Sequence, residues 1–334
     1  MTDLKSAKKR QLGSSDLKCA PIGLGCMSFS GVYGAADDDE TVDFVRYAID
    51  NGIDFLDSSD MYGWGHNEDV LARALKDGYR DKVVLATKFG QTQVEGGGMS
   101  VDGRPEYVME ACEKSLQRLG VDVIDLYYQH RVDQEVPIED TVGAMAKLVE
   151  QGKVKAIGIC EAKPETIRKA HATHPLAAVQ SEFSLIYREE AEQIRAATKE
   201  LGITFVAYSP LGRGILTDQY VNAETVDEND PHYRHPRFNK DNFQANRELI
   251  LRVAAYADKK GCTPAQLVLA WLIGLGDDIV AIPGTKRAER LDENTAAVGV
   301  SLTADEIAEI SAAVPVGAAA GNRYPDAQMK KVFV

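Results

Sequence analysis

Four polar residues stand where short apolar runs end, and their types could together move a proton. Asp57 and Tyr62 lie in FLDSSDMYGWGHNE, Lys88 lies in VVLATKFG, and His130 lies in VIDLYYQHR. Asp57, Lys88 and His130 each follow a run of apolar and β-branched residues directly, where a buried strand would end. At the carboxyl ends of successive parallel strands, a carboxylate, a phenol, an ammonium and an imidazole would form a proton-delivering site.

The chemistry of these four residues suggests a division of roles. A free tyrosine has a pKa of about 10, and a nearby ammonium such as that of Lys88 favours the phenolate and lowers this value. Burying the ammonium requires a partner, for which Asp57 is the obvious carboxylate. His130, expected to be neutral beside Lys88, would donate a ring N–H to a substrate carbonyl while Tyr62 protonates its oxygen. No side chain delivers hydride, so a nicotinamide or flavin is required, and an acid-type tyrosine favours the nicotinamide.

Short apolar runs alternate with amphipathic helical patterns along the chain, which is typical of βα units and a parallel sheet. The apolar runs are residues 22–26, 53–57, 83–89, 123–130, 155–159, 177–180, 203–208 and 279–282. Eight such repeats predict an α/β fold, a (β/α)8 TIM barrel formed by a single domain spanning residues 1–334. The alternative is an open doubly wound sheet, which usually has fewer strands.

Other segments fall outside this alternation. We expect a small β-hairpin at 11–19, before the first strand, and two additional helices at 264–273 and 304–313. Residues 211–242 are long and polar, and they read as a lid or a disordered loop after the seventh strand. Residues 90–104 read as a shorter loop on the same rim.

Composition narrows the possible partners. The net charge of −13 disfavours nucleic acid or an anionic membrane as a partner, because both reward clusters of Lys and Arg. Five cysteines are an odd number with no CxxC pair, so neither a disulfide framework nor a thiolate metal site is indicated. The N-terminus lacks the apolar stretch of a signal peptide, and no segment has the roughly 18 apolar residues of a spanning helix. These features predict a cytoplasmic protein.

The first apolar run offers a test for a dinucleotide fingerprint. The chain reads GLGCMS from Gly23, which matches two glycines of GxGxxG but places Ser28 where the third should be. The sequence also lacks GxxxxGK[ST]. A nucleotide, if bound, must therefore be held by other loops.

Five motifs carry a family resemblance that covers nearly the whole chain. They are DSSDMYG, ATKFG, YYQHR, AYSPLGRG and IPGTKRAERLDEN, and they fall at the ends of the second, third, fourth, seventh and eighth predicted strands. This set resembles the aldo-keto reductase family, in particular its bacterial and plant NADPH-dependent members. The resemblance implies a (β/α)8 barrel, a nicotinamide cofactor lying extended across the barrel mouth, and reduction of an aldehyde or ketone. It also implies that Asp57, Tyr62, Lys88 and His130 are the catalytic tetrad.

The resemblance further implies which residues hold the cofactor. Gln180 would contact the carboxamide and Tyr208 would stack on the nicotinamide. The pyrophosphate would follow Ser209, Pro210, Leu211 and Gly212, and the adenosine end would be held by Gly284, Thr285, Lys286, Arg290, Glu293 and Asn294. One position departs from the family pattern GxSE or GxSN, since this chain has Cys160 before Glu161, and a thiol is a weak hydrogen-bonding group.

The choice of cofactor rests on the basic segment GTKRAER. We expect Lys286 and Arg290 in the first turns of the last barrel helix, where exposed N–H groups favour an anion such as the 2′-phosphate of NADPH. The expected partner is thus a small-molecule aldehyde or ketone, with NADPH as cofactor and no metal.

Other interpretations of several of these residues, and of the function, stay open beside the catalytic one. Asp57 with Lys88 suits a structural ion pair on a barrel rim, and His171, His174, His232 and His235 read as solvated histidines. Phe29, Tyr33 and Trp64 either pack or line an apolar pocket. The alternative function is a cofactor-sensing barrel subunit with little turnover. A metal-dependent barrel hydrolase is disfavoured, because PIGLGC offers no pair of ligands.

Overall fold

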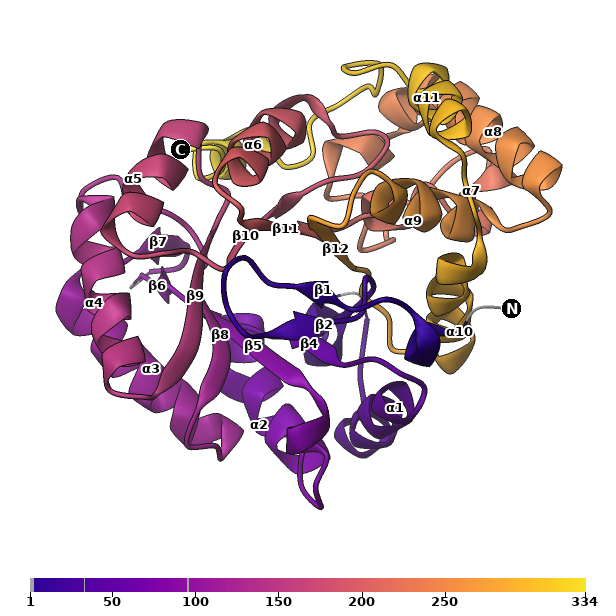
Figure 1. Ribbon diagram of the computed structural model, residues 1–334. Coiled ribbons are helices and arrows are strands. Elements are labelled where there is room, and N and C mark those ends of the chain that lie inside the picture. The colour runs from indigo at the N-terminus through magenta and orange to yellow at the C-terminus, as the bar shows by residue number, and fades with distance from the viewer. Residues whose placement is uncertain (1–2, 33, 95) are drawn as a thin grey trace.

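Eight parallel strands close into a barrel in the computed structural model, which describes residues 3–32, 34–94 and 96–334 (Figure 1). The strands are β3 (Leu24–Gly25), β4 (Phe55–Asp57), β5 (Val84–Phe89), β8 (Ile124–Gln129), β9 (Val154–Cys160), β10 (Ala178–Glu182), β11 (Thr204–Tyr208) and β12 (Ile279–Ile282). They pair in the order β12-β11-β10-β9-β8-β5-β4-β3. Parallel bridges from Ile22 to Ala281 and from Gly25 to Gly284 join the first strand to the last. The prediction of a closed barrel is confirmed, and the open sheet is wrong.

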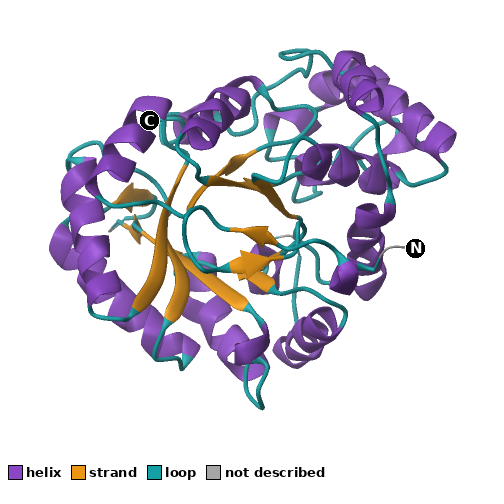
Figure 2. Cartoon of the chain, in the orientation of Figure 1, coloured by secondary structure: helices purple, strands orange, loops and turns teal. Residues whose placement is uncertain are grey.

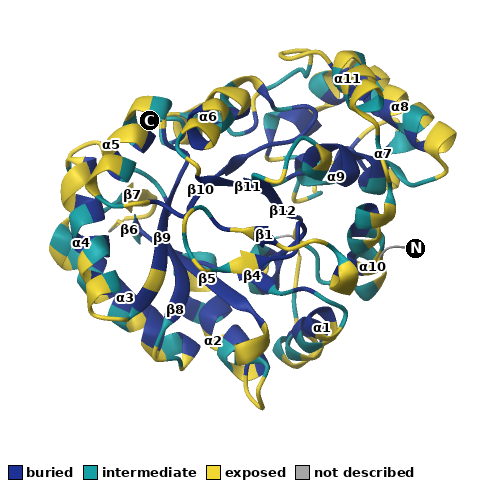
Figure 3. Cartoon of the chain, viewed as in Figure 1, coloured by how far each residue is buried: buried dark blue, intermediate teal, exposed yellow. Residues whose placement is uncertain are grey.

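A ring of helices surrounds the strands (Figure 2). It consists of α1 (Asp38–Asp50), α2 (His66–Ala74), α3 (Pro105–Leu119), α4 (Ile138–Glu150), α5 (Pro164–Thr173), α6 (Glu189–Glu200), α9 (Pro264–Gly274) and α10 (Ala288–Thr295). The helices α3, α5 and α9 begin at a proline, whose fixed φ suits the first helical turn. Their inward faces are buried and their outer faces are exposed (Figure 3).

Two helices lie outside this ring, α8 (Lys240–Lys260) and α11 (Ala304–Ala313), and both pack beside α9. The helix predicted at 264–273 is present as α9, but it packs against β12 and α10 and belongs to the ring. Its core residues explain this placement, because Leu267, Leu269 and Trp271 are buried and need cover on several sides. The second added helix is instead α8. Its first turn falls within the predicted 211–242 loop, which also contains the short α7 (Asp218–Val221).

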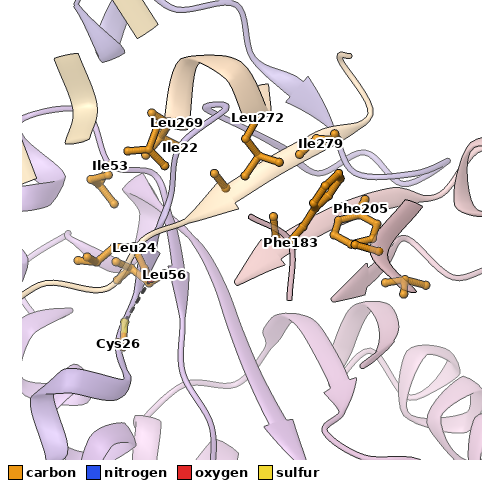
Figure 4. Close-up of a cluster of buried hydrophobic side chains, with 14 of the residues drawn as sticks. Ile22, Leu24, Cys26, Ile53, Leu56, Phe183, Phe205, Leu269, Leu272 and Ile279 are labelled. Atoms are coloured by element: carbon orange, nitrogen blue, oxygen red, sulfur yellow. Dashed lines mark hydrogen bonds between the residues drawn. The ribbon is translucent and has the colours of Figure 1, made fainter. Parts of the chain in front are cut away.

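Apolar side chains fill the barrel and the space around it. Inside, Phe55, Leu126 and Val206 belong to one buried cluster, to which Leu12 and Cys19 of the N-terminal hairpin also belong. That hairpin, β1 (Arg10–Gln11) and β2 (Lys18–Cys19), was predicted and covers one end of the barrel. Outside, strand residues such as Leu24 and Leu56 lie in a second cluster that also contains Leu269 and Leu272 of α9 (Figure 4). Both layers hold the strand ends rigidly.

The opposite end of the barrel carries the longer loops. The predicted 90–104 loop contains a small antiparallel sheet, β6 (Gln91–Gln93) and β7 (Met99–Val101). The C-terminal tail, residues 314–334, includes α12 (Asp326–Met329) and ends beside β9, where Lys163 N donates to the Val334 oxygen at 2.9 Å. In Figure 1 this end of the chain lies next to α5 and α6. No helix among the described residues is long and apolar enough to cross a membrane.

Candidate active site

The carboxyl ends of β4 and β5 bring Asp57 and Lys88 into a buried ion pair. Lys88 Nζ lies 2.5 Å from Asp57 Oδ1, 2.7 Å from the Ser58 carbonyl oxygen and 3.3 Å from the Tyr62 hydroxyl. Lys88 is fully buried and Asp57 is 2% exposed. Asp57 Oδ2 accepts from Gln180 Nε2 at 2.8 Å, so both carboxylate oxygens are occupied. The pair is therefore fixed in position at the floor of the barrel mouth.

Lys88 stays protonated although its side chain is buried. Burial alone lowers the pKa of an ammonium, but Asp57, Tyr62 and Cys160 together raise the pKa of Lys88 above its ordinary value. Lys88 consequently presents a permanent positive charge to the phenol oxygen of Tyr62.

Tyr62 opens a 3₁₀ turn (Tyr62–Gly65) in the loop after β4. Burial raises the pKa of this phenol to about 12, while Lys88 lowers it and Asp57 raises it. The expectation that the ammonium brings this pKa below its ordinary value is wrong, because the cost of desolvating a phenolate outweighs the attraction of Lys88. The phenol therefore stays protonated at neutral pH, as a proton donor must.

His130 follows β8 and faces Tyr62, with ring centroids 5.9 Å apart and planes at 82°. Burial, Arg131 and Lys88 lower its pKa well below the ordinary 6.5, so the imidazole is neutral as expected. Its Nδ1 lies 3.0 Å from Ser59 Oγ. If that hydroxyl donates, the ring proton stands on Nε2. Sequence reasoning missed Ser59, although it lies two residues after Asp57 in DSSD.

Cys160 ends β9 beside Gln180 of β10, its partner in the strand register. The thiol is 1% exposed, and burial raises its pKa to about 12 although Lys88 opposes the shift. It belongs to the apolar cluster inside the barrel. Access to thiol reagents is accordingly poor.

Tyr208, predicted to stack on the nicotinamide, ends β11, and the predicted pyrophosphate segment, residues 209–212, follows it directly. Ser209 and Gly212 adopt φ of +47° and +59°, and Leu211 between them has φ of −94° and ψ of 15°. A right-handed residue followed by a left-handed one can turn successive N–H groups towards an anion, and in this turn the Gly212 N–H already donates to the Ser209 oxygen at 2.9 Å. A Cβ at Gly212 would lie 2.7 Å from Ile186 Cδ1, so a larger residue there would have to displace that side chain. Pro210 is buried. This segment suits a pyrophosphate.

The predicted adenosine residues lie in the loop after β12 and in α10. Lys286 precedes α10, which begins at Ala288, so Lys286 lies before its first turn. Its Nζ is held by backbone oxygens of Gly34, at 3.1 Å, and Ala35. Arg290 contacts Asp218 at 2.9 Å and Glu293 at 2.7 Å. Both cations are thus engaged within the protein. Around them, Gly284 is exposed, Thr285 Oγ1 accepts from Arg287 N at 3.2 Å, and Asn294 is buried.

Sequence reasoning missed a group of buried charges on the same rim, which we call the rim cluster. It consists of Glu161, Glu182, Arg213, Arg237 and Arg323. Glu182 lies two residues beyond Gln180 on β10 and so shares its face, which the alternation of a strand could have indicated. Arg323 belongs to the C-terminal tail, and the sequence carries no local signal for its position.

Several residues with open interpretations now have a place. His235 is 7% exposed and its ring lies 6.1 Å from that of Tyr324, so it is not a solvated histidine. Phe29 is fully buried against Phe44, whereas Trp64 is 44% exposed. Tyr33 lies outside the described residues. Within the described parts of the chain, no three His, Cys, Asp or Glu side chains are grouped to hold a metal ion.

Comparisons with known proteins agree with this geometry. Residues 21–315 match the profile of the Aldo/keto reductase family. The chain is 46% identical over 315 residues to the probable aldo-keto reductase 1 of Glycine max, covering 94% of this chain and 91% of that protein. The structure resembles the glycerol dehydrogenase of Gluconobacter oxydans, with a TM-score of 0.84, 27% identity, and coverage of 91% of this chain and 94% of that one.

A second solved structure bears on the cofactor. The aldo/keto reductase of Klebsiella pneumoniae, in complex with NADP and acetate, has a TM-score of 0.72 and 26% identity, and the match covers 96% of this chain and 99% of that one. Members of the family generally use a nicotinamide cofactor to reduce the carbonyl groups of small substrates. With its closed barrel and its lysine, carboxylate and phenol at the strand ends, this oxidoreductase chain belongs to the aldo/keto reductase family.

Proposed function

We propose that this chain is an NADPH-dependent reductase that converts an aldehyde or ketone to the alcohol, with Tyr62 as the proton donor. One observation carries the proposal: the buried Lys88 ammonium lies 2.5 Å from Asp57 and 3.3 Å from the Tyr62 hydroxyl. A protonated phenol beside a permanent cation is suited to give up its proton when charge develops on a nearby oxygen. The whole chain, residues 1–334, would act as one barrel domain.

The four tetrad residues have separate tasks in this proposal. Bound NADPH supplies the hydride. His130, neutral, donates from Nε2 to the carbonyl oxygen and orients it. Tyr62 transfers its proton to that oxygen, and Lys88 stabilises the phenolate that remains. Asp57 keeps Lys88 charged and, through Gln180, ties β4 to β10 across the barrel.

The cofactor would extend from the tetrad to α10. Tyr208 would stack on the nicotinamide, Gln180 would contact the carboxamide, and the turn at residues 209–212 would hold the pyrophosphate. For the 2′-phosphate of NADPH, Arg290 would exchange its contact with Asp218 for the phosphate, and Lys286 would add its charge from the neighbouring loop. Glu293 would keep Arg290 in place during the exchange. The five free cysteines, four of them buried, suit a reducing compartment, and we place the enzyme in the cytoplasm.

A screen of aldehydes and ketones with NADPH, followed at the nicotinamide absorbance, tests the proposal. The wild-type protein should oxidise NADPH only in the presence of a carbonyl compound, and Tyr62→Phe should abolish this while still binding NADPH. Tight NADPH binding without turnover on any carbonyl would favour the cofactor-sensing subunit instead.

A further inference from the structure

The C-terminal tail inserts a buried arginine into the rim of the barrel mouth. Arg323 is 1% exposed, and its two terminal nitrogens lie 2.7 and 2.6 Å from the two carboxylate oxygens of Glu161. Glu161 is fully buried at the end of β9. A second carboxylate, Glu190 of α6, lies 3.0 Å from Arg323. This fork geometry fixes the planar guanidinium against Glu161 more firmly than a point charge would.

Glu161 itself is held in an unusual backbone conformation. Its φ is +56°, in the left-handed region that residues with a side chain adopt rarely. Its Oε1 accepts from Ser181 Oγ and from the Glu182 N–H, each at 3.0 Å, and its carbonyl accepts from the Val334 N–H at 3.2 Å. Such a conformation persists only where the surroundings overdetermine it, and it often marks a functional site.

The same carboxylate controls the phenol of Tyr208. The Tyr208 hydroxyl donates to Glu161 Oε1 at 2.7 Å, while Arg323 Nη1 lies 3.1 Å from the Tyr208 oxygen. The Tyr324 hydroxyl, next in the tail, lies 3.1 Å from the same oxygen. Among the described residues, two of the three hydrogen-bonding contacts of the Tyr208 hydroxyl therefore come from the tail.

Glu161 stays ionised, so its contacts with Arg323 and Tyr208 persist at neutral pH. Burial alone raises the pKa of a carboxyl, but the charge and hydrogen bonds of Arg323, with help from Arg131 and Tyr208, lower the pKa of Glu161 to about 2. Glu161 therefore remains an acceptor for the Tyr208 hydroxyl across the whole physiological range of pH.

We propose that Arg323 is a positioning residue for the reaction, which fixes the ring of Tyr208 through Glu161 and so sets the pose of the nicotinamide. The inference rests on the proposed function, in which the nicotinamide stacks on Tyr208. A buried ion pair is weak evidence for stability on its own, because replacing it with apolar residues is often neutral. The Glu161–Arg323 pair instead connects the tail to the Tyr208 hydroxyl, and this connection gives the pair a role in positioning the Tyr208 ring.

The test compares two ligands that share the adenosine end but differ at the nicotinamide. Dissociation constants of NADPH and of 2′,5′-ADP are measured by calorimetry for the wild type, Arg323→Met, Arg323→Lys and Tyr208→Phe. Arg323→Met should weaken NADPH about tenfold and leave 2′,5′-ADP unchanged, and Arg323→Lys should fall between it and the wild type. Lys331→Met, which removes another tail cation that contacts the Met99 carbonyl on the rim, is the matched control and should behave as wild type.

Two further measurements separate positioning from folding. In the Tyr208→Phe background, Arg323→Met should add little further loss of NADPH affinity, because both variants break one coupled contact. With NADPH deuterated at the transferred position, the isotope effect on kcat should grow in Arg323→Met, since misaligned hydride transfer becomes rate-limiting. If Arg323→Met fails to fold, Arg323→Lys and Tyr208→Phe carry the test.

The inference is overturned if folded Arg323→Met binds NADPH like the wild type, if the two substitutions are additive, or if 2′,5′-ADP is weakened equally. If Arg323→Met does not fold, wild-type NADPH binding by both remaining variants overturns it. A wild type that binds NADPH but reduces no carbonyl would instead overturn the proposed function.

Discussion

Two buried ion pairs lie at the carboxyl ends of barrel strands, and each contacts the hydroxyl of a tyrosine. Asp57–Lys88 on β4 and β5 places its cation 3.3 Å from the Tyr62 oxygen. Glu161–Arg323, beside β11, places its carboxylate 2.7 Å from the Tyr208 oxygen. A neighbouring cation stabilises a phenolate, whereas a neighbouring carboxylate keeps a phenol as a donor. Burial and Glu161 raise the pKa of Tyr208 well above its ordinary value. Burial also raises the pKa of Tyr62, so in the proposed mechanism it is the cation beside Tyr62 that favours this phenol as the proton donor.

The largest expected effect comes from Tyr62→Phe. General acid catalysis is typically worth about 10² to 10⁴ in rate, so carbonyl turnover should fall by at least that factor while NADPH binding persists. The measurement is kcat together with the calorimetric affinity for NADPH. Tyr208→Phe is the matched control and should leave kcat within roughly tenfold, because its phenol transfers no proton. Equal losses of kcat in Tyr62→Phe and Tyr208→Phe would contradict the assignment of Tyr62 as the proton donor.

Cofactor preference should show the next largest effect. Each charge-assisted hydrogen bond to the 2′-phosphate contributes about 1.5–3 kcal/mol, so NADPH should bind roughly 10²-fold or more tightly than NADH. Replacing Lys286 and Arg290 together should weaken NADPH and leave NADH nearly unchanged.

The contact between Arg290 and Asp218 sharpens the cofactor prediction. Asp218→Asn removes the carboxylate that competes with the phosphate for Arg290, so it should tighten NADPH and not NADH. Dissociation constants of both cofactors at low and high salt provide the measurement, and the preference should shrink as salt rises. If the wild type binds NADPH and NADH with equal affinity, Lys286 and Arg290 do not bind the 2′-phosphate.

The Glu161–Arg323 ion pair should make the free energy of unfolding depend on pH in the acid range. With a folded pKa of about 2 against an ordinary value near 4.5, Glu161 contributes stability that is fully present above about pH 4.5 and is lost as pH falls towards 2. The full difference is on the order of 3 kcal/mol.

Urea titrations between pH 5 and pH 2.5 test this linkage. Glu161→Gln should flatten the decline in the free energy of unfolding by up to about 1.4 kcal/mol per pH unit. Glu200→Gln, at an exposed pair with Arg168, is the control and should change the slope little. An unchanged slope in Glu161→Gln would mean that Arg323 does not hold this carboxylate.

The Asp57–Lys88 pair could be predicted from the sequence, whereas the Glu161–Arg323 pair could not. Asp57, Lys88 and His130 each lie at or next to the carboxyl end of a strand, and parallel strands place these ends on one rim, so the local pattern was enough. The partner of Glu161 comes from residue 323, and no periodicity links a barrel strand to a tail that folds back over the rim. The same limit applies to Arg290, whose partner Asp218 lies in a segment that reads as an irregular loop.

Two other differences have a similar cause. The direction of the Tyr62 pKa depends on how completely the phenol is desolvated, which spacing along the chain does not report. Helix α8 was missed because its first turn continues a polar stretch, and its buried residues begin only at Phe243. The closed barrel itself depended on repeated strand and helix patterns, and for that reason it was predictable.

A smaller effect is expected from Ser59→Ala. Ser59 Oγ lies 3.0 Å from His130 Nδ1 and 3.3 Å from Asp60 Oδ1, and we expect its single proton to go to His130, which would favour the tautomer with the proton on Nε2. Loss of one neutral hydrogen bond is worth about 0.5–1.5 kcal/mol, so kcat should fall by roughly threefold to tenfold. NADPH affinity should not change, because the defect lies at the substrate carbonyl. Ser59→Thr retains the hydroxyl and should restore most of the rate. An alanine variant with wild-type kcat would show that the imidazole needs no such partner.

The smallest effect should come from Cys160, which lies between the two ion pairs at the end of β9. Its thiol is buried and its pKa is raised to about 12, so thiolate is scarce at pH 8 and alkylation should be slow. Cys160→Ser should change NADPH affinity by at most about tenfold, since a neutral hydrogen bond contributes about 0.5–1.5 kcal/mol. The alkylation rate, measured by mass spectrometry with and without NADPH, should rise with pH as the thiolate fraction grows. Rapid labelling at pH 8 in the folded protein would mean that this rim opens, and the fixed placement of both phenols would then have to be abandoned.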